Sequence, residues 1–119
     1  MMKRYIVKIG IADEAELRQR SIDIAAGRRH RKRGEPKVWF TSMRAAAEVL
    51  SEKNRALLRI LAEEQPESVR ELAALTGRAE SNLSRTLKTL AGYGFIRLER
   101  KDKIVRPVAR PMEFEIRTM

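Results

Sequence analysis

The chain has 119 residues, of which 43% are hydrophobic and only 5% aromatic, so we expect an aliphatic core in a domain of ordinary size. Its formal net charge of +10 favours a polyanionic partner: DNA, RNA or an anionic membrane surface. The absence of cysteine and the single histidine exclude disulfides, thiol catalysis and cysteine-based metal centres.

The same residues argue against an enzyme, a cofactor and a membrane protein. One histidine, no cysteine and no glycine-rich phosphate loop leave no catalytic set, and no carboxylates are spaced for a metal ion around His30. No apolar run approaches the roughly 20 residues that span a bilayer. The N-terminal sequence turns acidic too early for a secretory signal. We therefore expect a cytoplasmic protein without cofactor or metal.

The N-terminal residues predict a strand followed by a helix. Residues 3–11 alternate between apolar and other side chains, which is typical of a strand. Asp13 is placed to cap a helix of about residues 14–27, which Gly27 ends. Its apolar residues form no single stripe, so we expect this helix to contact two surfaces, such as its own core and a partner subunit.

A run of basic residues comes next, comprising Arg28, Arg29, Arg31, Lys32 and Arg33. Like charges cannot be buried together, so we interpret the run as a linker. It is either a basic arm that reaches phosphates or a minor groove, or a solvated loop. A boundary near Pro36 then divides the chain into a strand–helix extension, 1–36, for dimerisation or partner binding, and a domain formed by 37–119.

Residues 38–64 predict a short strand and two helices. Val38-Trp39-Phe40 is typical of a strand, and the segment from Ser42 to Leu50 has apolar residues at helical spacing, namely Met43, Ala46, Ala47 and Leu50. Ser51 is placed to cap a third helix of about residues 52–64. Its inward-facing residues are expected to be Leu57, Ile60 and Leu61.

The next segment has the pattern of two helices joined by a tight turn. Ser68 and Glu71 form an S-x-x-E capping box, in which each side chain satisfies an unpaired backbone donor. The helix of residues 69–76 is expected to bury Val69, Leu72 and Leu75. Gly77 then stands where the turn favours a positive φ.

The second of these helices, about residues 79–91, divides into two sides when its residues are placed at 100° intervals. Its apolar side carries Leu83, Leu87 and Leu90. Its opposite side carries Arg78, Ser81, Arg85 and Lys88, and its flanks carry Asn82, Ser84 and Thr89. An ordinary amphipathic helix with a solvated basic side shares this pattern. In the present context we interpret it as a helix that enters a major groove.

The chemistry of this polar side suits DNA. Arg85 is able to bond guanine O6 and N7 in parallel, and Asn82 adenine in the same way. We expect Arg85, Asn82 and Ser81 to read bases. Arg78 and Lys88 are expected mainly to hold phosphates.

After Gly92 the chain predicts a β-hairpin, or wing, over about residues 96–108. Its tip carries Arg100, Lys101 and Lys103, which we expect to contact phosphates or a minor groove; a solvated tip is the alternative. Residues 112–117 predict a last strand with one apolar side. Since a strand needs a pairing partner, we expect it to pair with strand 3–11 of the same chain or of a second subunit.

The stretch ELAALTGRAESNLSRTLKTLAGYGFI resembles the core of winged helix-turn-helix regulators of the MarR and ArsR type. Residues 37–117 are similar to a prokaryotic family of predicted transcriptional regulators. The resemblance implies a homodimeric DNA-binding repressor, often encoded beside a toxin-like partner and then acting as an antitoxin. The chain lacks the long dimerisation helices of MarR proteins and the metal-binding cysteines of ArsR proteins, so the resemblance does not extend to small-molecule or metal sensing.

These inferences lead to one expected fold and two main functions. The fold is α+β, mainly α: a winged helix-turn-helix with an N-terminal strand–helix extension and a C-terminal strand. The leading function is a homodimeric regulator of transcription that binds double-stranded DNA. The alternative is an antitoxin that neutralises a toxin protein through residues 1–36 and autoregulates its operon. RNA binding ranks lower, because the aromatic platforms of single-stranded RNA modules are missing.

Overall fold

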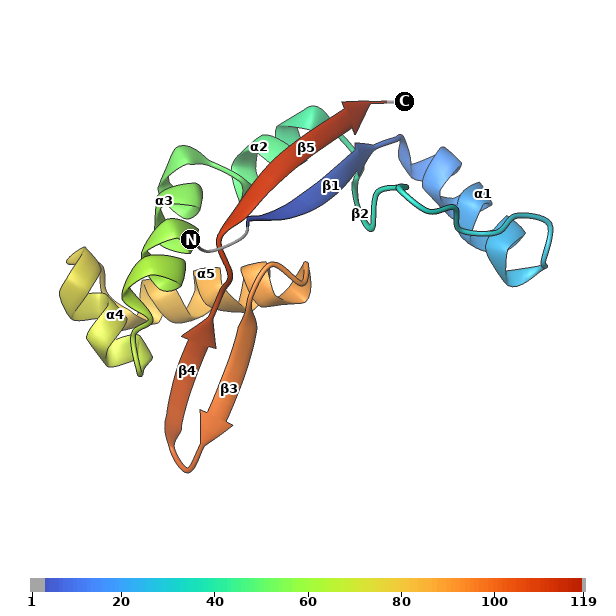
Figure 1. Ribbon diagram of the computed structural model, residues 1–119. Helices are drawn as coiled ribbons and strands as arrows, with labels where there is room; N and C mark the ends of the chain where they lie inside the picture. Colours follow the sequence, from blue (N-terminus) through green and yellow to red (C-terminus); the bar gives the residue numbers. More distant parts are fainter. Residues whose placement is uncertain (1–3, 119) are drawn as a thin grey trace. The chain divides into compact units, whose positions relative to one another are not determined.

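The computed structural model describes residues 4–118, and these form an α+β fold with five helices and five strands (Figure 1). The α+β class predicted from the sequence is confirmed. The chain divides into two compact units. The first unit is built mainly from residues 49–111, and the second unit from residues 5–48 and 112–118. Lys3, at the start of the predicted first strand, lies outside the described residues.

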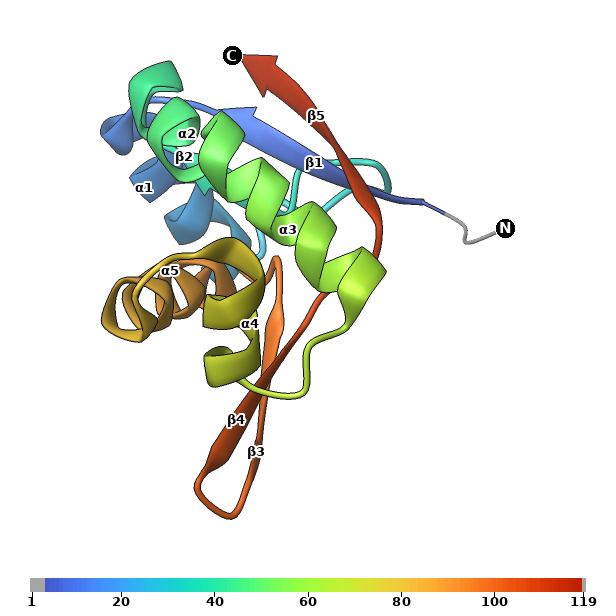
Figure 2. The ribbon, with the colours of Figure 1, turned by 90° about the vertical axis from the view of Figure 1, so that its left-hand side faces the viewer.

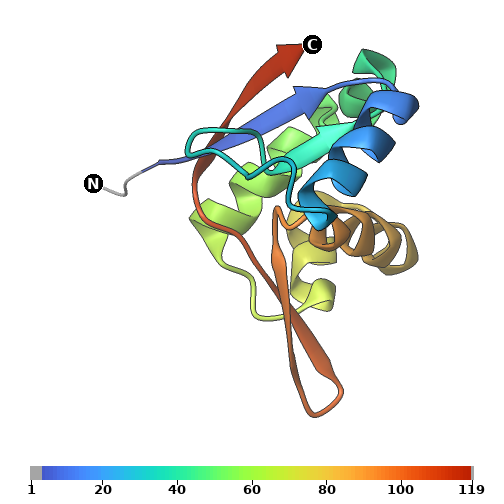
Figure 3. The ribbon, with the colours of Figure 1, turned by 90° about the vertical axis from the view of Figure 1, so that its right-hand side faces the viewer.

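The second unit contains a three-stranded parallel sheet in the order β2-β1-β5 (Figure 3). The central strand is β1 (Tyr5–Ile11), flanked by β2 (Val38–Phe40) and β5 (Met112–Thr118). The predicted pairing of the first and last strands therefore occurs within one chain. The predicted boundary at Pro36 falls inside this unit, because β2 pairs with β1.

The alternation that predicted β1 is visible in its burial. Val7, Ile9 and Ile11 are buried, whereas Tyr5 at the start of the strand is exposed. Gly10 faces the opposite side and lies directly beneath the ring of Trp39, its partner on β2. A Cβ on residue 10 would lie 2.4 Å from two ring carbons, so only glycine lets the indole lie flat on the sheet.

Helix α1 (Glu14–Ala25) begins where the sequence predicted, because the Asp13 carboxylate accepts a 2.8 Å hydrogen bond from the backbone N–H of Glu16. It ends two residues early, before Gly27, whose φ is +78°. No residue of α1 is buried, and Ile22 is exposed. The missing stripe in the sequence thus corresponds to a helix without a buried apolar side.

Helix α2 (Met43–Val49) follows a cap by the Ser42 hydroxyl, which accepts a 3.0 Å hydrogen bond from the backbone of Ala45. Ala46 is buried, but Met43 and Ala47 of the expected apolar stripe are exposed. Seven residues make only about two helical turns, and Ala46 is the one residue of α2 that is buried.

Helix α3 (Glu52–Glu64) opens the first unit, capped by Ser51 as predicted. Leu57 and Leu61 are buried, together with Leu58 and Ala62, whereas Ile60 is only half-buried. The inward side therefore lies one residue away from the predicted stripe.

Helix α4 (Val69–Thr76) carries the predicted cap. The Ser68 hydroxyl accepts from the Glu71 backbone, while the Glu71 carboxylate accepts from the backbone of Glu67. Gly77 ends the helix with φ +73°. Leu72 is fully buried, but the expected burial of Leu75 is wrong: it is 48% exposed. Residues three apart share a helix side, so spacing alone does not exclude Leu75; the side of α4 that meets its neighbours is centred on Leu72 and does not extend to Leu75.

Candidate nucleic-acid interface

The candidate site lies in the first unit and is built on helix α5 (Glu80–Gly92). Leu83, Leu87 and Leu90 are at most 1% exposed, as their shared helical side predicted. Each fully buried leucine contributes about 1.5–3 kcal/mol relative to an exposed one. This leucine side fixes which way the rest of α5 points, and α4 packs beside it (Figure 2).

The side of α5 opposite the leucines is open to solvent. Ser81, Asn82, Arg85, Lys88 and Thr89 are exposed, while Arg78 and Ser84 on its margins are half-buried. Within residues 4–118, the side chains of Ser81, Arg85 and Lys88 make no hydrogen bond or ion pair. These three polar groups are therefore available to a ligand. Their exposure agrees with the sequence, and their role in DNA binding stays a prediction.

Arg78 and Asn82 are joined, which the sequence did not indicate. The Arg78 guanidinium donates to Asn82 Oδ1 over 2.6 and 3.1 Å, and also to the Thr86 hydroxyl over 3.3 Å. Because a guanidinium has only donors, the carbonyl oxygen of Asn82 must face it. Asn82 consequently presents its amide N–H groups outward.

Thr89 also differs from a free contact residue. Its hydroxyl donates a 3.2 Å hydrogen bond to the backbone carbonyl of Arg85 one turn earlier. A hydroxyl bonded back to its own helix has less to offer a ligand. Among the predicted contact residues of α5, this leaves Ser81, Arg85 and Lys88 as the least engaged.

The hairpin of the same unit consists of β3 (Arg97–Lys101) and β4 (Ile104–Val108), and it extends away from helices α3, α4 and α5 (Figure 2). Lys101 pairs with Ile104, so Asp102 and Lys103 form a two-residue turn in which Asp102 has φ +56°. The predicted cationic tip residues, Arg100, Lys101 and Lys103, are all exposed. Ile104 beside them is 56% exposed.

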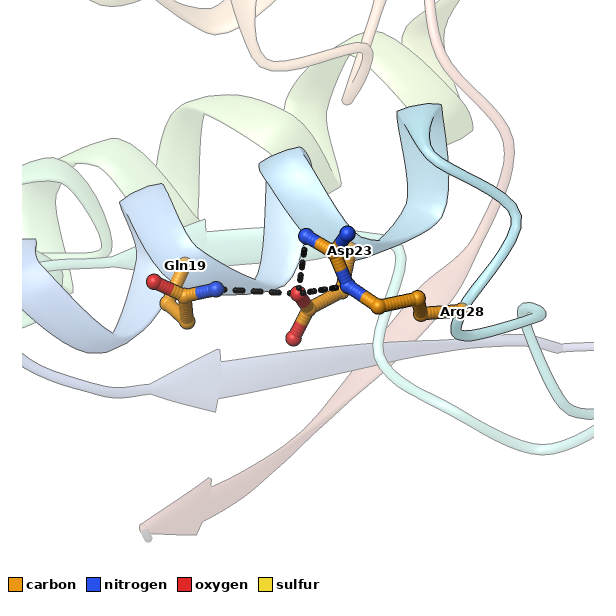
Figure 4. A network of polar contacts seen from close by, with 3 residues as sticks. All are labelled: Gln19, Asp23 and Arg28. Atoms are coloured by element: carbon orange, nitrogen blue, oxygen red, sulfur yellow. Dashed lines mark hydrogen bonds and ion pairs between the residues drawn. The ribbon is translucent and has the colours of Figure 1, made fainter.

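The basic run of residues 28–33 lies in the second unit and is partly tied down. Arg28 donates to Asp23 Oδ1 over 3.0 and 3.1 Å, and Gln19 donates to the same oxygen (Figure 4). The hydrogen bond from Gln19, and then that from Arg28, hold the pKa of Asp23 below its ordinary value. Arg29 lies 3.7 Å from the carboxylate of Glu35.

The expectation of a simple charged linker is therefore wrong for two of its residues. Arg28 and Arg29 neutralise carboxylates of their own unit, because α1 and the loop supply Asp23 and Glu35 close by. Arg31, Lys32 and Arg33 stay exposed. Within residues 4–118, the basic run therefore has three cations, not five, without an ion pair.

The sequence also missed the contact that attaches α1 to its sheet. Arg20 Nη2 donates to Glu35 Oε2 over 2.7 Å, and its guanidinium carbon lies 5.0 Å from the centroid of a Trp39 ring. The hydrogen bond from Arg20 lowers the pKa of Glu35. Arg20 thus links Glu35 of the loop to the indole that lies on Gly10, which is a structural role.

The part of the chain that the structure describes contains neither a metal-binding cluster nor a membrane-spanning helix. Residues 4–118 contain no group of three or more histidine, cysteine, aspartate or glutamate side chains arranged to hold a metal ion. In the same range, every helix is too short or too polar to cross a bilayer.

A family model matches the part of the chain that carries the candidate interface. The HVO_A0114 family model matches residues 49–116, more than half of the chain. The chain belongs to the HVO_A0114 family. The match runs from α3 through the β3–β4 hairpin and most of β5, so the HVO_A0114 region includes the candidate interface. No curated protein and no solved structure matches the chain significantly.

Proposed function

We propose that this protein is a regulator of transcription that binds double-stranded DNA in a sequence-specific way. In this proposal α4 and α5 form a helix-turn-helix, with Gly77 in the turn, and the β3–β4 hairpin is the wing. The net charge of +10 supports a polyanionic partner.

One observation carries the proposal: helix α5 is divided between a buried leucine side and an exposed polar side. The leucines leave α5 one orientation in its unit, with Ser81, Arg85 and Lys88 outward. A helix held in this way fits the major groove of B-DNA, which is about 12 Å wide. The cationic hairpin tip belongs to the same unit and adds phosphate contacts beside it.

Each residue on α5 has a proposed role that takes its hydrogen bonds into account. Arg85 has an unengaged guanidinium and is our first candidate for reading guanine. Asn82 has its carbonyl oxygen bonded to Arg78, so it offers donors and suits base acceptors such as guanine N7 or thymine O4 better than adenine. Arg78 then positions Asn82 in addition to any phosphate contact.

The remaining residues serve the backbone of the DNA. Phosphate contacts are assigned to Lys88, Ser84, Arg100, Lys101 and Lys103. Two further residues lie on these helices: Arg70 is exposed on α4, and Glu80 is exposed in the first turn of α5. In helix-turn-helix proteins the first helix crosses the DNA backbone, which suits Arg70. The carboxylate of Glu80 repels phosphate and stabilises the N-terminus of α5.

The experiment is a footprint on the DNA upstream of the protein's own gene, repeated over a series of salt concentrations. We expect Arg85→Ala to weaken binding by about 1–3 kcal/mol and to relax preference at one base pair. Lys101→Ala should weaken all sequences alike and reduce the dependence on salt. Arg59→Ala removes an exposed charge from α3 and is the matched control. The proposal fails if no site is protected at low salt.

We also propose that the protein acts as a homodimeric repressor. Two recognition helices would then occupy successive major grooves about 34 Å apart, and the operator would be a pseudo-palindrome. The spacing of protected half-sites in the footprint tests this part independently of any one residue.

A second candidate function is the antitoxin, in which α1 binds a protein encoded by a neighbouring gene. The observation that favours it is the exposed Ile22 on a helix without buried residues. Deleting residues 1–36 would remove the central strand β1, so a substitution is the cleaner test. Ile22→Glu should abolish partner binding and leave DNA binding intact. If the parent and the variant bind the partner equally well, α1 is not the docking helix.

A further inference from the structure

The outer edge of β5 carries a pairing surface that the proposed function leaves unused. β5 is the terminal strand of its sheet, so alternate residues turn their backbone N–H and C=O groups away from β1. Along this strand Glu115, Ile116, Arg117 and Thr118 are exposed. The large apolar side chain of Ile116 is 47% exposed.

This edge carries charged side chains but lacks the other usual protections against pairing. Edge strands are normally short, bulged, charged or blocked by proline. The charges of β5 are of both signs, Glu113 and Glu115 against Arg117, so they are able to pair with each other between two copies. β5 has seven residues, contains neither proline nor lysine, and matches β1 residue by residue without a bulge. The opposite edge of the sheet is β2, which has only three residues. The long regular edge is therefore the one suited to adding a strand.

We propose that β5 pairs antiparallel with β5 of a second copy of this chain, joining two three-stranded sheets into one. The inference deepens the homodimer of the proposed function by naming its surface. A two-fold axis is natural here, because an edge strand is the same surface in both copies.

The backbone and the length of β5 select one register. Along β5, every second residue turns its backbone N–H and C=O groups outward, and these residues must face one another in the two copies. An odd-numbered residue therefore pairs only with an odd-numbered residue, and an even-numbered residue only with an even-numbered one. Full overlap of Met112–Thr118 then places Glu115 on the two-fold axis. In this register Glu113 faces Arg117 of the second copy, and Phe114 faces Ile116 of the second copy.

The side chains agree with this register on both sides of the sheet. Glu113 and Arg117 give two opposite-charge pairs, related by the axis. Phe114 and Ile116 extend the apolar side formed by Val7 and Ile9, their neighbours on β1. Cross-strand pairs of both kinds stabilise antiparallel sheets.

Glu115 faces itself across the axis, which by itself opposes pairing. Lys8 is the neighbour of Glu115 on β1 and lies on the same side of the sheet. The dimer thus forms a row of Lys8, Glu115, Glu115 and Lys8, in which each carboxylate has a cation on its other flank. The like charges are offset within the row.

The test is sedimentation equilibrium of the full chain without DNA, over a range of concentrations. Arg117→Glu alone and Glu113→Arg alone each turn two attractive pairs into repulsive ones, and the dimer dissociation constant should rise about tenfold. The double variant exchanges the charges and should return it to within about threefold of the parent. Glu63→Arg, on α3, is the matched control for a surface charge reversal.

A crosslink tests the register itself. The chain has no cysteine, so Glu115→Cys introduces the only thiol. Opposed residues of antiparallel strands lie about 4.5–5.5 Å apart between Cα atoms, which a disulfide spans. We expect rapid intermolecular oxidation of this variant and little of Glu64→Cys on α3. Circular dichroism shows whether each variant stays folded.

Two results would overturn the proposal. One is a chain that sediments as a monomer at every concentration. The other is a dimer that resists both charge reversals and leaves Glu115→Cys unlinked, which would place the interface elsewhere. If a monomer protects the operator, the β5 interface is rejected and the DNA-binding proposal stands. If the chain dimerises through β5 but protects no operator, the interface stands and the DNA-binding proposal is rejected.

Discussion

Helices α5 and α1 have nearly the same length, 13 and 12 residues, but are held in different ways. Helix α5 buries three leucines almost completely. Helix α1 buries no residue and contacts its sheet through Arg20, which bridges Glu35 and Trp39. Helix α5 is therefore held by the burial of apolar surface. Helix α1 is held by a hydrogen bond and a cation–π contact, which depend on the positions of a few atoms.

The largest expected effect follows from the leucine side of α5. Leu87→Ala should lower the free energy of unfolding by about 2–5 kcal/mol, because it removes buried methyl groups and leaves a cavity. Ile22→Ala, the matched change on α1, should alter it by no more than about 0.5 kcal/mol, since Ile22 is exposed. Urea denaturation measures both, and similar losses would contradict the contrast between the helices.

A smaller effect is expected from the polar stack of α1. Arg20→Ala removes a charged hydrogen bond at a side chain that is 12% exposed, and it leaves Glu35 without its closest partner. We expect a loss of about 1.5–3 kcal/mol, the range for hydrogen bonds to charged groups. Arg18→Ala breaks the exposed pair with Glu14 and should cost almost nothing. Equal effects of the two changes would show that Arg20 does not anchor α1.

The smallest effect depends on pH. The pKa of Glu35 is lowered from its ordinary 4.5 in the folded chain, so the unfolded chain binds a proton at higher pH. The stability from the Arg20–Glu35 pair is therefore present above pH 4.5 and is lost as the pH falls through the lower folded value. Glu35→Gln should melt below the parent at pH 7, and this gap should shrink below pH 4.5. A gap that does not change with pH would mean that the pair contributes little.

Local patterns in the sequence predicted most of the elements. The caps at Asp13, Ser51 and Ser68 placed three helix starts, because a cap depends on side chains within three residues of the backbone that it satisfies. Glycine with positive φ placed the end of α4. The leucine side of α5 followed from helical angles alone, because these angles depend only on spacing along the chain.

Contacts between distant segments were harder to predict. Leu75 matched the apolar spacing of α4, but which side of an eight-residue helix meets its neighbours depends on where those neighbours lie. The boundary at Pro36 missed the pairing of β2 with β1, because a charged run indicates solvent exposure and carries no information on strand pairing. The ion pairs of Arg28 and Arg29 were missed for that reason too.

By itself the sequence determined the α+β class, the limits of most helices and strands, and the two sides of α5, since periodicity and capping act within a few residues. Only the tertiary structure decided that β5 runs parallel to β1 within one chain and forms an open edge. It also decided that Arg20 anchors α1, and that Arg78 turns the amide of Asn82 outward. These outcomes depend on where one segment places the hydrogen-bonding groups of another, and linear spacing does not encode that distance.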